Sequence, residues 1–250
     1  MAALRWGCHK AMCTNATTAR GFSQFGEDKM MFQSFFCDTC PGRTYVEIGA
    51  LDGVKYSNTL FLERNFNWHG VLVEGHPENA AKLFHMRGKS GKNIIFNEAI
   101  CSHANIIPFS GPSGLGTAGV MYDMDESYLR SWGHRFRNTR NYTVPCRPLT
   151  ALLKLAGIRK IDVFSLDVEG AEYKVLQTMD WSIDVHVWLV EMSQIDRSER
   201  NEAIRWLLAR NNYIEARIDV PGPNRIFVHR DLNGTLLQRM RYCATCKQQL

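Results

Sequence analysis

The sequence predicts an α/β fold in which helices cover both faces of one mostly parallel sheet. Helix and strand patterns alternate along nearly the whole chain of 250 residues, as in doubly wound folds. Residues 70–74 form a continuous apolar run, which is typical of a parallel strand that is buried on both faces. Near the end, two strand patterns flank the link Val220-Pro-Gly-Pro223, which favours a hairpin. The last strand of the sheet is therefore expected to run antiparallel to the others.

The first half of the chain supplies the first group of helices and strands. Residues 28–36 have helical apolar spacing, and residues 44–48 are rich in β-forming residues. Pro77 stands where helices often begin, and good helix formers follow it. The expected elements are helix 28–36, strand 44–48, helix 58–64, strand 70–74, helix 77–87, strand 93–100 and an edge strand at 106–109.

The alternation breaks between residues 110 and 140, which hold glycines, aromatics and charges without a period. An insertion of this length is usually functional or disordered, and we expect it to contact the substrate. No change in composition marks a domain boundary, so we expect one domain at 22–232, an N-terminal extension at 1–21 and a cysteine-containing tail at 233–250. After the insertion the expected elements are helix 149–156, strand 162–167, helix 171–179, strand 185–191, helix 199–210 and strands 213–219 and 225–228.

Composition and charge limit the partners and the location. A hydrophobic content of 45% and a charged content of 22% are ordinary for a globular protein. The net charge of +5 is too small to indicate a nucleic-acid partner. No stretch approaches the roughly 18 consecutive apolar residues of a membrane span, and the first twenty residues lack the apolar core of a secretory signal. This slightly favours the cytoplasm, and the secretory pathway stays open if the chain is a fragment of an anchored protein; the oligomeric state is also open.

The first strand and its loop have features of a nucleoside site. The strand ends in Glu47, and the loop that follows holds Gly49 and Gly53, which let the backbone approach a ligand closely. The next strand ends in Glu74, and an acid at that point can accept both hydroxyls of a ribose. The glycines follow neither the G-x-G-x-x-G pattern of dinucleotide sites nor the loop of ATPases. A ligand with ribose but without phosphates fits best, and S-adenosyl-L-methionine is the obvious candidate.

Several motifs follow one another in a fixed order from about residue 22 to about residue 230. They are Ser23-Gln-Phe-Gly-Glu-Asp28, the Glu47–Gly53 loop, Val73-Glu74, Val144-Pro-Cys-Arg-Pro-Leu149, residues 161–172 with the segment SLDVEGAE, and Val190-Glu191-Met192. Together they resemble the FkbM-type family of S-adenosylmethionine-dependent methyltransferases.

Membership of this family would imply a class I methyltransferase fold, with a seven-stranded sheet and an antiparallel last strand. It would also imply methyl transfer to oxygen, commonly a hydroxyl of a sugar. Many members have Lys before the strand-four Asp, whereas this chain has Ser165-Leu166, which weakens any transfer of substrate identity. The residues expected to bind the cofactor are Gln24, Asp28, Glu47, Gly49, Ala50, Asp52, Gly53, Glu74, Gly75 and Asp167.

Acidic residues at two strand ends are the candidates for catalysis. A sugar hydroxyl needs a base that accepts its proton, and Asp167 ends the fourth parallel strand at the edge where ligands of open α/β sheets bind. Glu169 lies in the same turn and is a second candidate. Together with Glu191 they could bind a divalent metal such as magnesium, although their spacing does not establish it. Glu172 is expected to cap or salt-bridge the helix that follows.

Two further groups of residues have more than one possible role. His134 lies in the insertion beside aromatic and basic residues, a mixture suited to sugar binding, and is a candidate general base. Ser23, with Glu27 and Asp28, resembles a helix-capping signal, while the family resemblance favours a cofactor role for Gln24 and Asp28.

The leading function is therefore S-adenosylmethionine-dependent methyl transfer to a hydroxyl of a sugar or glycoconjugate. The expected acceptor is a small molecule or glycan, and no nucleic acid is expected. A nucleic-acid methyltransferase and a non-catalytic interaction module are the alternatives.

The eight cysteines fall into two groups. Cys101 and Cys146 lie inside the expected fold and are predicted to pack as small apolar residues. The remaining six lie toward the ends and could form disulfides, bind zinc or stay as free thiols. They are Cys8, Cys13, Cys37, Cys40, Cys243 and Cys246.

Overall fold

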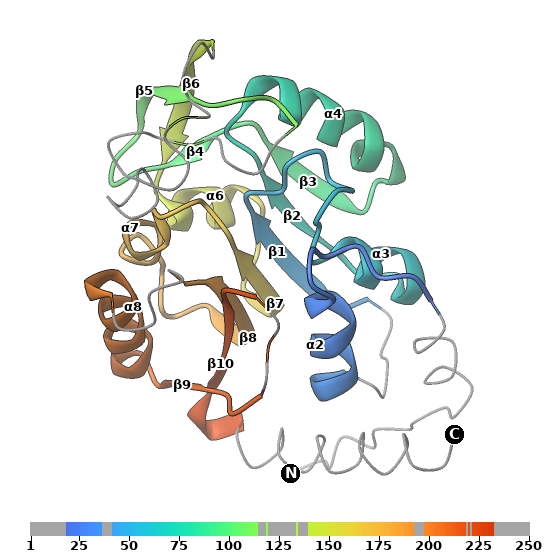
Figure 1. The fold of residues 1–250 in the computed structure, drawn as a ribbon, viewed down its shortest axis with the longest axis vertical. Helices are drawn as coiled ribbons and strands as arrows, with labels where there is room; N and C mark the ends of the chain where they lie inside the picture. Colours follow the sequence, from blue (N-terminus) through green and yellow to red (C-terminus); the bar gives the residue numbers. More distant parts are fainter. Residues whose placement is uncertain are drawn as a thin grey trace.

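A computed structural model describes residues 19–36, 42–114, 119, 134, 140–192, 198–218, 220 and 222–232. Within these residues the chain forms a seven-stranded sheet with helices on both sides and a separate three-stranded sheet (Figure 1). The helices are α2 (Glu27–Phe35), α3 (Leu60–Phe66), α4 (Pro77–Arg87), α6 (Leu149–Leu155), α7 (Glu172–Leu176) and α8 (Glu199–Arg210), with 3-10 turns η1 (Gly88–Ser90) and η3 (Arg230–Leu232).

The large sheet has the order β3-β2-β1-β7-β8-β10-β9. Its strands are β1 (Thr44–Ile48), β2 (His69–Val73), β3 (Asn93–Phe96), β7 (Lys160–Leu166), β8 (Asp184–Glu191), β9 (Tyr213–Glu215) and β10 (Asn224–His229). The first five in this order are parallel neighbours, and β10 is antiparallel to both β8 and β9. The predicted α/β fold with an antiparallel last strand is thus confirmed.

Two apolar cores hold the helices against the sheet. On one face, residues of α2, α3 and α4 pack on alternate residues of the strands, and on the other face α6, α7 and α8 do the same (Figure 1). Strand β1 shows why both faces are covered, because Tyr45 belongs to one core while Val46 and Ile48 belong to the other. Successive side chains of a strand point to opposite faces, so a strand with apolar side chains on both faces needs helices on each side.

The predicted strand 93–100 is wrong as a single element. It divides into β3 in the large sheet and β4 (Ala99–Ile100) in the small one, between which Asn97 Nδ2 donates to the carbonyl oxygens of Glu74 and Gly75. The small sheet has the order β4-β6-β5, with β5 (Asn105–Ser110) at its edge. Its central strand β6 (Asn141–Arg147) was not predicted, because Pro145 interrupts the pattern and proline is rare inside a sheet.

Cys101 and Cys146 form a disulfide bond, with 5.7 Å between their Cα atoms. The prediction that they pack as free apolar residues is therefore wrong, although Cys146 does lie in the small core between β4, β5 and β6. The register explains the bond, since Ala99 and Ile100 pair with Cys146 and Arg147 and bring Cys101 beside the end of β6. The six other cysteines lie outside the described residues.

The start of α2 is hydrogen-bonded to the start of β10. Asn224, at the start of β10, donates from Nδ2 to Glu27 Oε1 at 2.7 Å, and both residues are buried. Glu27 also accepts from the Phe25 N–H at 2.8 Å. This fixes residues 22–26 over the carboxyl ends of the central strands.

None of the described helices combines the length and the apolarity that crossing a membrane requires.

Candidate functional site

A cavity of about 380 Å³ opens at the carboxyl ends of the central parallel strands. This is the edge at which open α/β sheets bind their ligands, and the volume is within the usual range for small-molecule sites. Its walls come from β1, β2, β7 and β8, from the loops that follow them, and from the segment before α2. The lining residues that bear on function are Gln24, Phe25, Glu47, Gly49, Ala50, Lys55, Tyr56, Glu74, Gly75, Glu98, Phe109, Asp167, Glu169 and Glu191.

Glycine is required where the loop after β1 meets the end of β7. Gly49 has φ +86°, and a Cβ there would lie 1.8 Å from the backbone oxygen of Asp167. No other residue would allow the two strand ends to approach so closely. The N–H groups of Gly49 and Ala50 both donate to the carbonyl of Val73 at 3.0 Å, so the loop is also tied to β2.

Glu74 stands just beyond β2 with its carboxylate already oriented. Oε2 accepts from the Leu51 N–H at 2.8 Å, and Oε1 accepts from the His76 N–H at 2.7 Å. Burial raises the pKa of Glu74 to about 7, although these backbone hydrogen bonds favour the ionised form. Each carboxylate oxygen can accept more than one hydrogen bond, so both retain capacity for a ligand in the cavity.

Glu47 lines the cavity but is largely occupied by protein donors. It accepts from Ser57 Oγ at 2.9 Å, from the Asn58 N–H at 2.7 Å and from Thr59 Oγ1 at 2.6 Å. Arg87 Nη1 lies 3.4 Å away, and Nη2 of the same guanidinium lies 2.7 Å from Glu63. Glu47 therefore holds the loop after β1 in shape as well as facing the site.

Three predicted cofactor residues are not among the described residues that line the cavity. Asp28 is fully buried and accepts from the Phe22 N–H at 2.6 Å and from Ser23 Oγ at 2.8 Å, so it braces the segment that carries Gln24. Asp52 accepts from the backbone N–H groups of residues 54 and 55 and closes a turn. Gly53 is needed for packing, because a Cβ there would lie 2.5 Å from a side-chain carbon of Leu83.

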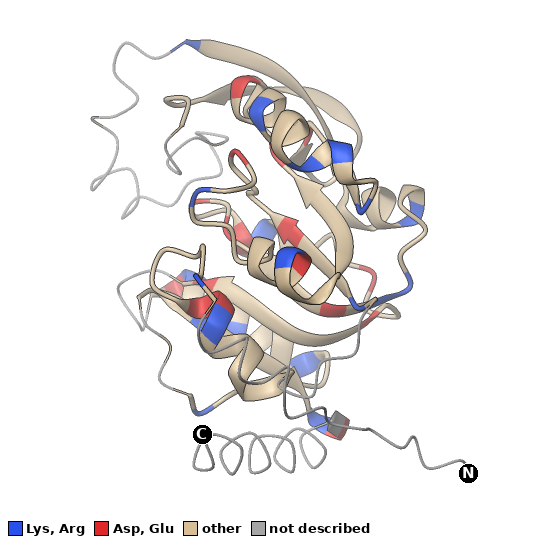
Figure 2. Cartoon of the chain, turned by 90° about the vertical axis from the view of Figure 1, so that its right-hand side faces the viewer, with Lys and Arg blue, Asp and Glu red and all other residues tan. Residues whose placement is uncertain are grey.

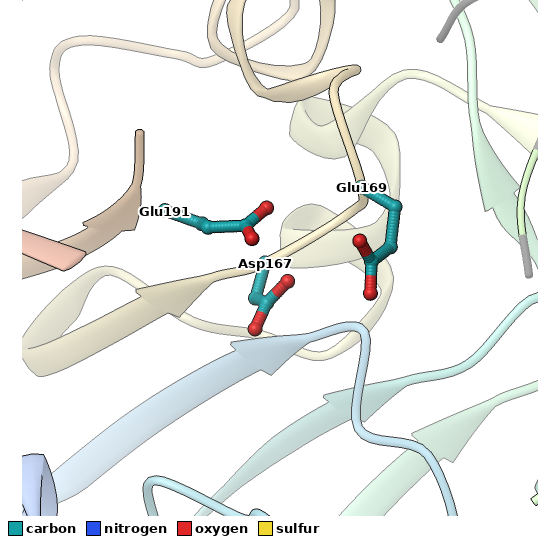
Figure 3. Close-up of side chains that lie close together, drawn as sticks. All are labelled: Asp167, Glu169 and Glu191. Carbon is teal, nitrogen blue, oxygen red and sulfur yellow. The ribbon is translucent and has the colours of Figure 1, made fainter. Parts of the chain in front are cut away.

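Asp167, Glu169 and Glu191 converge in the cavity (Figure 3). One carboxylate oxygen from each lies within 4.8 Å of those of the other two. Asp167 follows β7 directly, Glu191 is the last residue of β8, and Glu169 projects from the turn after β7 with φ +59°. A left-handed backbone is uncommon for a side chain of this kind and is often found at functional sites.

The closeness of the carboxylates changes their acidity. Burial, together with the charges of Glu172, Glu27 and Glu47, raises the pKa of Asp167 to about 7. Burial and the neighbouring Asp167 raise the pKa of Glu191 well above its ordinary value. The arrangement can hold a shared proton, an ammonium group or a hard cation between carboxylate oxygens.

Glu172 has a structural role, but it differs from the predicted one of capping or salt-bridging α7, because its carboxylate holds the turn before α7 and pairs with α8. It accepts from the Val168 N–H at 3.0 Å and the Gly170 N–H at 3.1 Å, and it forms an ion pair with Arg200 at 2.7 Å. Its carboxylate therefore shapes the turn that presents Glu169, and it is committed to protein partners.

The sequence did not indicate several cavity residues. Phe25, Lys55 and Tyr56 lie in loops without a periodic pattern, and Glu98 and Phe109 reach the cavity only because the small sheet stands beside β2. Only Glu98 could have been predicted, because it follows the parallel strand β3 closely, as Glu74 follows β2 and Asp167 follows β7. His134 is exposed and is not among the described lining residues, so its role as a base stays a prediction.

This strand order, with its single antiparallel strand and its site at the carboxyl edge, defines the class I methyltransferase fold. The sequence model of the Methyltransferase FkbM domain matches residues 47–215, which is more than half of the chain. The chain belongs to the FkbM methyltransferase family, as the motifs predicted.

Solved structures with the same fold are distant. An FkbM methyltransferase from Methylobacillus flagellatus KT is 10% identical with a TM-score of 0.48, and the match covers 88% of this chain and 58% of that one. The chain thus spans little more than half the length of that protein. A SAM-dependent methyltransferase from Aquifex aeolicus is 9% identical with a TM-score of 0.41 over 89% of this chain and 97% of that chain. M. jannaschii TYW2, solved in complex with AdoMet, is 10% identical with a TM-score of 0.39 over 85% and 80%. No curated protein sequence matches the chain.

Proposed function

We propose that this protein is an S-adenosyl-L-methionine-dependent O-methyltransferase that acts on a hydroxyl of a sugar or glycoconjugate. The observation that carries the proposal is the carboxylate of Glu74, held by two backbone N–H groups at the wall of a cavity that Asp167 and Glu191 also line. Membership of the FkbM methyltransferase family supports it independently.

The residues present fit the cofactor. Glu74 has a backbone donor on each oxygen and the Asn79 side chain as a further donor, and its remaining lone pairs can accept the two ribose hydroxyls. Gly49, Ala50, Gly75 and Gln24 line the same cavity. When bound, S-adenosyl-L-methionine supplies a methyl group that is activated by a positively charged sulfur.

The chain's own acids provide for the acceptor's proton. As the new carbon–oxygen bond forms, the hydroxyl oxygen loses its proton, and the ionised carboxylate of Asp167 accepts it. A base whose pKa is near 7 is well matched to this task at neutral pH. Glu169 and Glu191 complete the set of acceptors around the hydroxyl, and the surrounding walls reduce competition from water.

A divalent cation bound by Asp167, Glu169 and Glu191 is the competing arrangement for the same oxygens. Turnover measured in EDTA and after addition of Mg²⁺ separates the two arrangements. Activity that survives EDTA supports the carboxylates as direct proton and hydrogen-bond acceptors, and activity lost in EDTA but restored by Mg²⁺ supports the cation.

A nucleic-acid acceptor is disfavoured by charge. Glu47, Glu74, Glu98, Asp167, Glu169 and Glu191 line the cavity, whereas Lys55 is the one basic residue among its described lining residues. Phosphate groups would be repelled there. In the described part of the chain, Lys and Arg are spread over many helices and loops (Figure 2), rather than forming the basic surface expected of a nucleic-acid site.

Calorimetry with S-adenosyl-L-methionine tests the proposal. We expect the wild type to bind and Glu74→Gln to bind about 10- to 100-fold more weakly, because hydrogen bonds to a charged acceptor are worth about 1.5–3 kcal/mol. Glu199→Gln, at an exposed glutamate outside the cavity, is the matched control and should bind as the wild type does. Absence of binding by the wild type would reject the proposed function.

A further inference from the structure

We propose that Phe25 and Tyr56 form the acceptor subsite and that they stack on the apolar C–H face of a neutral sugar ring. The inference rests on the proposed function, because it names the part of the same cavity that holds the acceptor. It also defines the acceptor's chemistry more narrowly, as a ring with a C–H face, several hydroxyls and no negative charge.

Two aromatic side chains stand at the opening of the cavity. Phe25 and Tyr56 both line it, and each is 45% exposed, whereas the aromatic residues of the two cores are nearly inaccessible. Large aromatic surfaces are costly to leave in water, and a pair of them beside a concave polar site indicates a binding surface. The rings offer the broad apolar contact that pyranose C–H groups need.

The two aromatic residues belong to segments that are far apart in the sequence and joined through the backbone. Ser23 and Tyr56 form an isolated parallel β-bridge, which joins the segment before α2 to the loop after β1. Phe25 packs on Gly222, where a Cβ would lie 2.5 Å from a carbon of its ring. Glu27 also holds the Phe25 backbone at 2.8 Å. The position of Phe25 is therefore fixed before any ligand binds.

Tyr56 is held in an unfavourable backbone conformation. Its φ of +62° is left-handed, which is rare for a bulky aromatic residue. The Lys55 ammonium lies 4.9 Å from the centre of its ring, and the same ammonium donates to the carbonyl of Gly114 at 3.0 Å. Conformations of this kind persist where the surroundings enforce them, and they cluster at ligand sites.

The acids of the same cavity favour a neutral polyol. Asp167, Glu169 and Glu191 offer carboxylate oxygens, which accept hydrogen bonds from hydroxyls when ionised. When ionised, the same oxygens repel a phosphate, sulfate or carboxylate on the acceptor. A sugar ring bound in this cavity would satisfy both groups, with its C–H face on the aromatic rings and its hydroxyls toward the acids.

Saturation-transfer NMR with methyl glycosides of neutral hexoses, and of uronic acids for comparison, tests the proposal without relying on turnover. We expect transfer to the ring C–H protons of at least one neutral glycoside and none to the uronic acids. Phe25→Ala and Tyr56→Ala should weaken this binding at least tenfold, while Tyr56→Phe, which keeps the ring, should retain it. Phe84→Ala is the matched control, because Phe84 is 46% exposed on α4 and does not line the cavity.

Calorimetry with S-adenosyl-L-methionine on the same proteins separates the two proposals. If the cofactor binds and no neutral glycoside shows transfer, or if the alanine variants bind glycosides as well as the wild type, the acceptor subsite is overturned while the proposed cofactor site stands. If glycosides bind through Phe25 and Tyr56 but the cofactor does not, the subsite is supported and the methyltransferase proposal fails.

Discussion

Single residues at strand ends account for most of the candidate site. Glu74 and Asp167 were predictable because a charged residue directly after an apolar parallel strand lies at the ligand edge of the sheet. Asp28 and Asp52 were predicted by motif alone, and the structure shows their carboxylates engaged with backbone N–H groups beside the cavity. Tyr56 could not be predicted, because nothing in its local sequence indicates a left-handed backbone.

The acidity of Asp167 gives a prediction for pH. Its pKa of about 7 means that it is increasingly protonated as the pH falls below about 7, and a protonated carboxyl cannot accept the hydroxyl proton. We expect kcat/KM to fall about tenfold per pH unit below that point and to level off above it. A pH–rate profile checks this. Asp180→Asn, at a half-buried acid outside the cavity, should leave the profile unchanged, and a wild-type profile that stays flat through pH 7 would exclude this ionisation from the rate.

The elements around the site are joined by one buried arginine. Arg87, in the last turn of α4, is 1% exposed and reaches Glu63 of α3, Glu47 of β1 and the phenol of Tyr45, to which Nη2 donates at 2.8 Å. Burial of so many polar groups is tolerated because each finds a partner. The sequence pattern of α4 places Arg87 near the end of the helix. It does not indicate that the side chain is buried between α3 and β1.

Replacement of Arg87 tests how much its buried ion pairs stabilise the protein. In Arg87→Met the carboxylates of Glu47 and Glu63 stay buried without their partner, and breaking a buried pair typically costs about 3–5 kcal/mol. We expect the free energy of unfolding to fall by that amount in urea titrations. Lys89→Met, at an exposed lysine two residues on, should change it by less than about 0.5 kcal/mol. Equal stability of the two variants would show that the network contributes little.

At the scale of the whole molecule, the sequence predicted the large sheet well and the small sheet poorly. Long apolar strands and periodic helices, such as β1 and α8, have the predicted bounds because local pattern and burial agree. The small sheet depends on a strand with an internal proline and on pairing between residues 99–100 and 146–147, which are distant in sequence. Such pairing leaves no local signal, so Glu98 and Phe109 at the cavity wall were missed as well.

The disulfide gives a prediction at the same scale, because it links the two ends of the segment 101–146, which contains the insertion at 110–140. Cys101 and Cys146 are 45 residues apart, and a crosslink over a loop of that length stabilises a protein by about 4 kcal/mol in the chain-entropy description. The double variant Cys101→Ala/Cys146→Ala should therefore melt about 10 °C below the wild type. Calorimetric Tm values and mass spectrometry of the linked peptides check this. Identical Tm values, or a wild type without the linked peptide, would contradict it.

The hydrogen bond between Asn224 and Glu27 has a consequence for how the site comes into being during synthesis. One wall of the cavity depends on a contact between residues 197 positions apart. A growing chain therefore cannot complete this wall until β10 has left the ribosome. The same holds for any shortened chain limited to residues 47–215, which would keep the part that matches the family model and lose both partners of the contact. One wall of the cavity is therefore completed only after β10 has been synthesised.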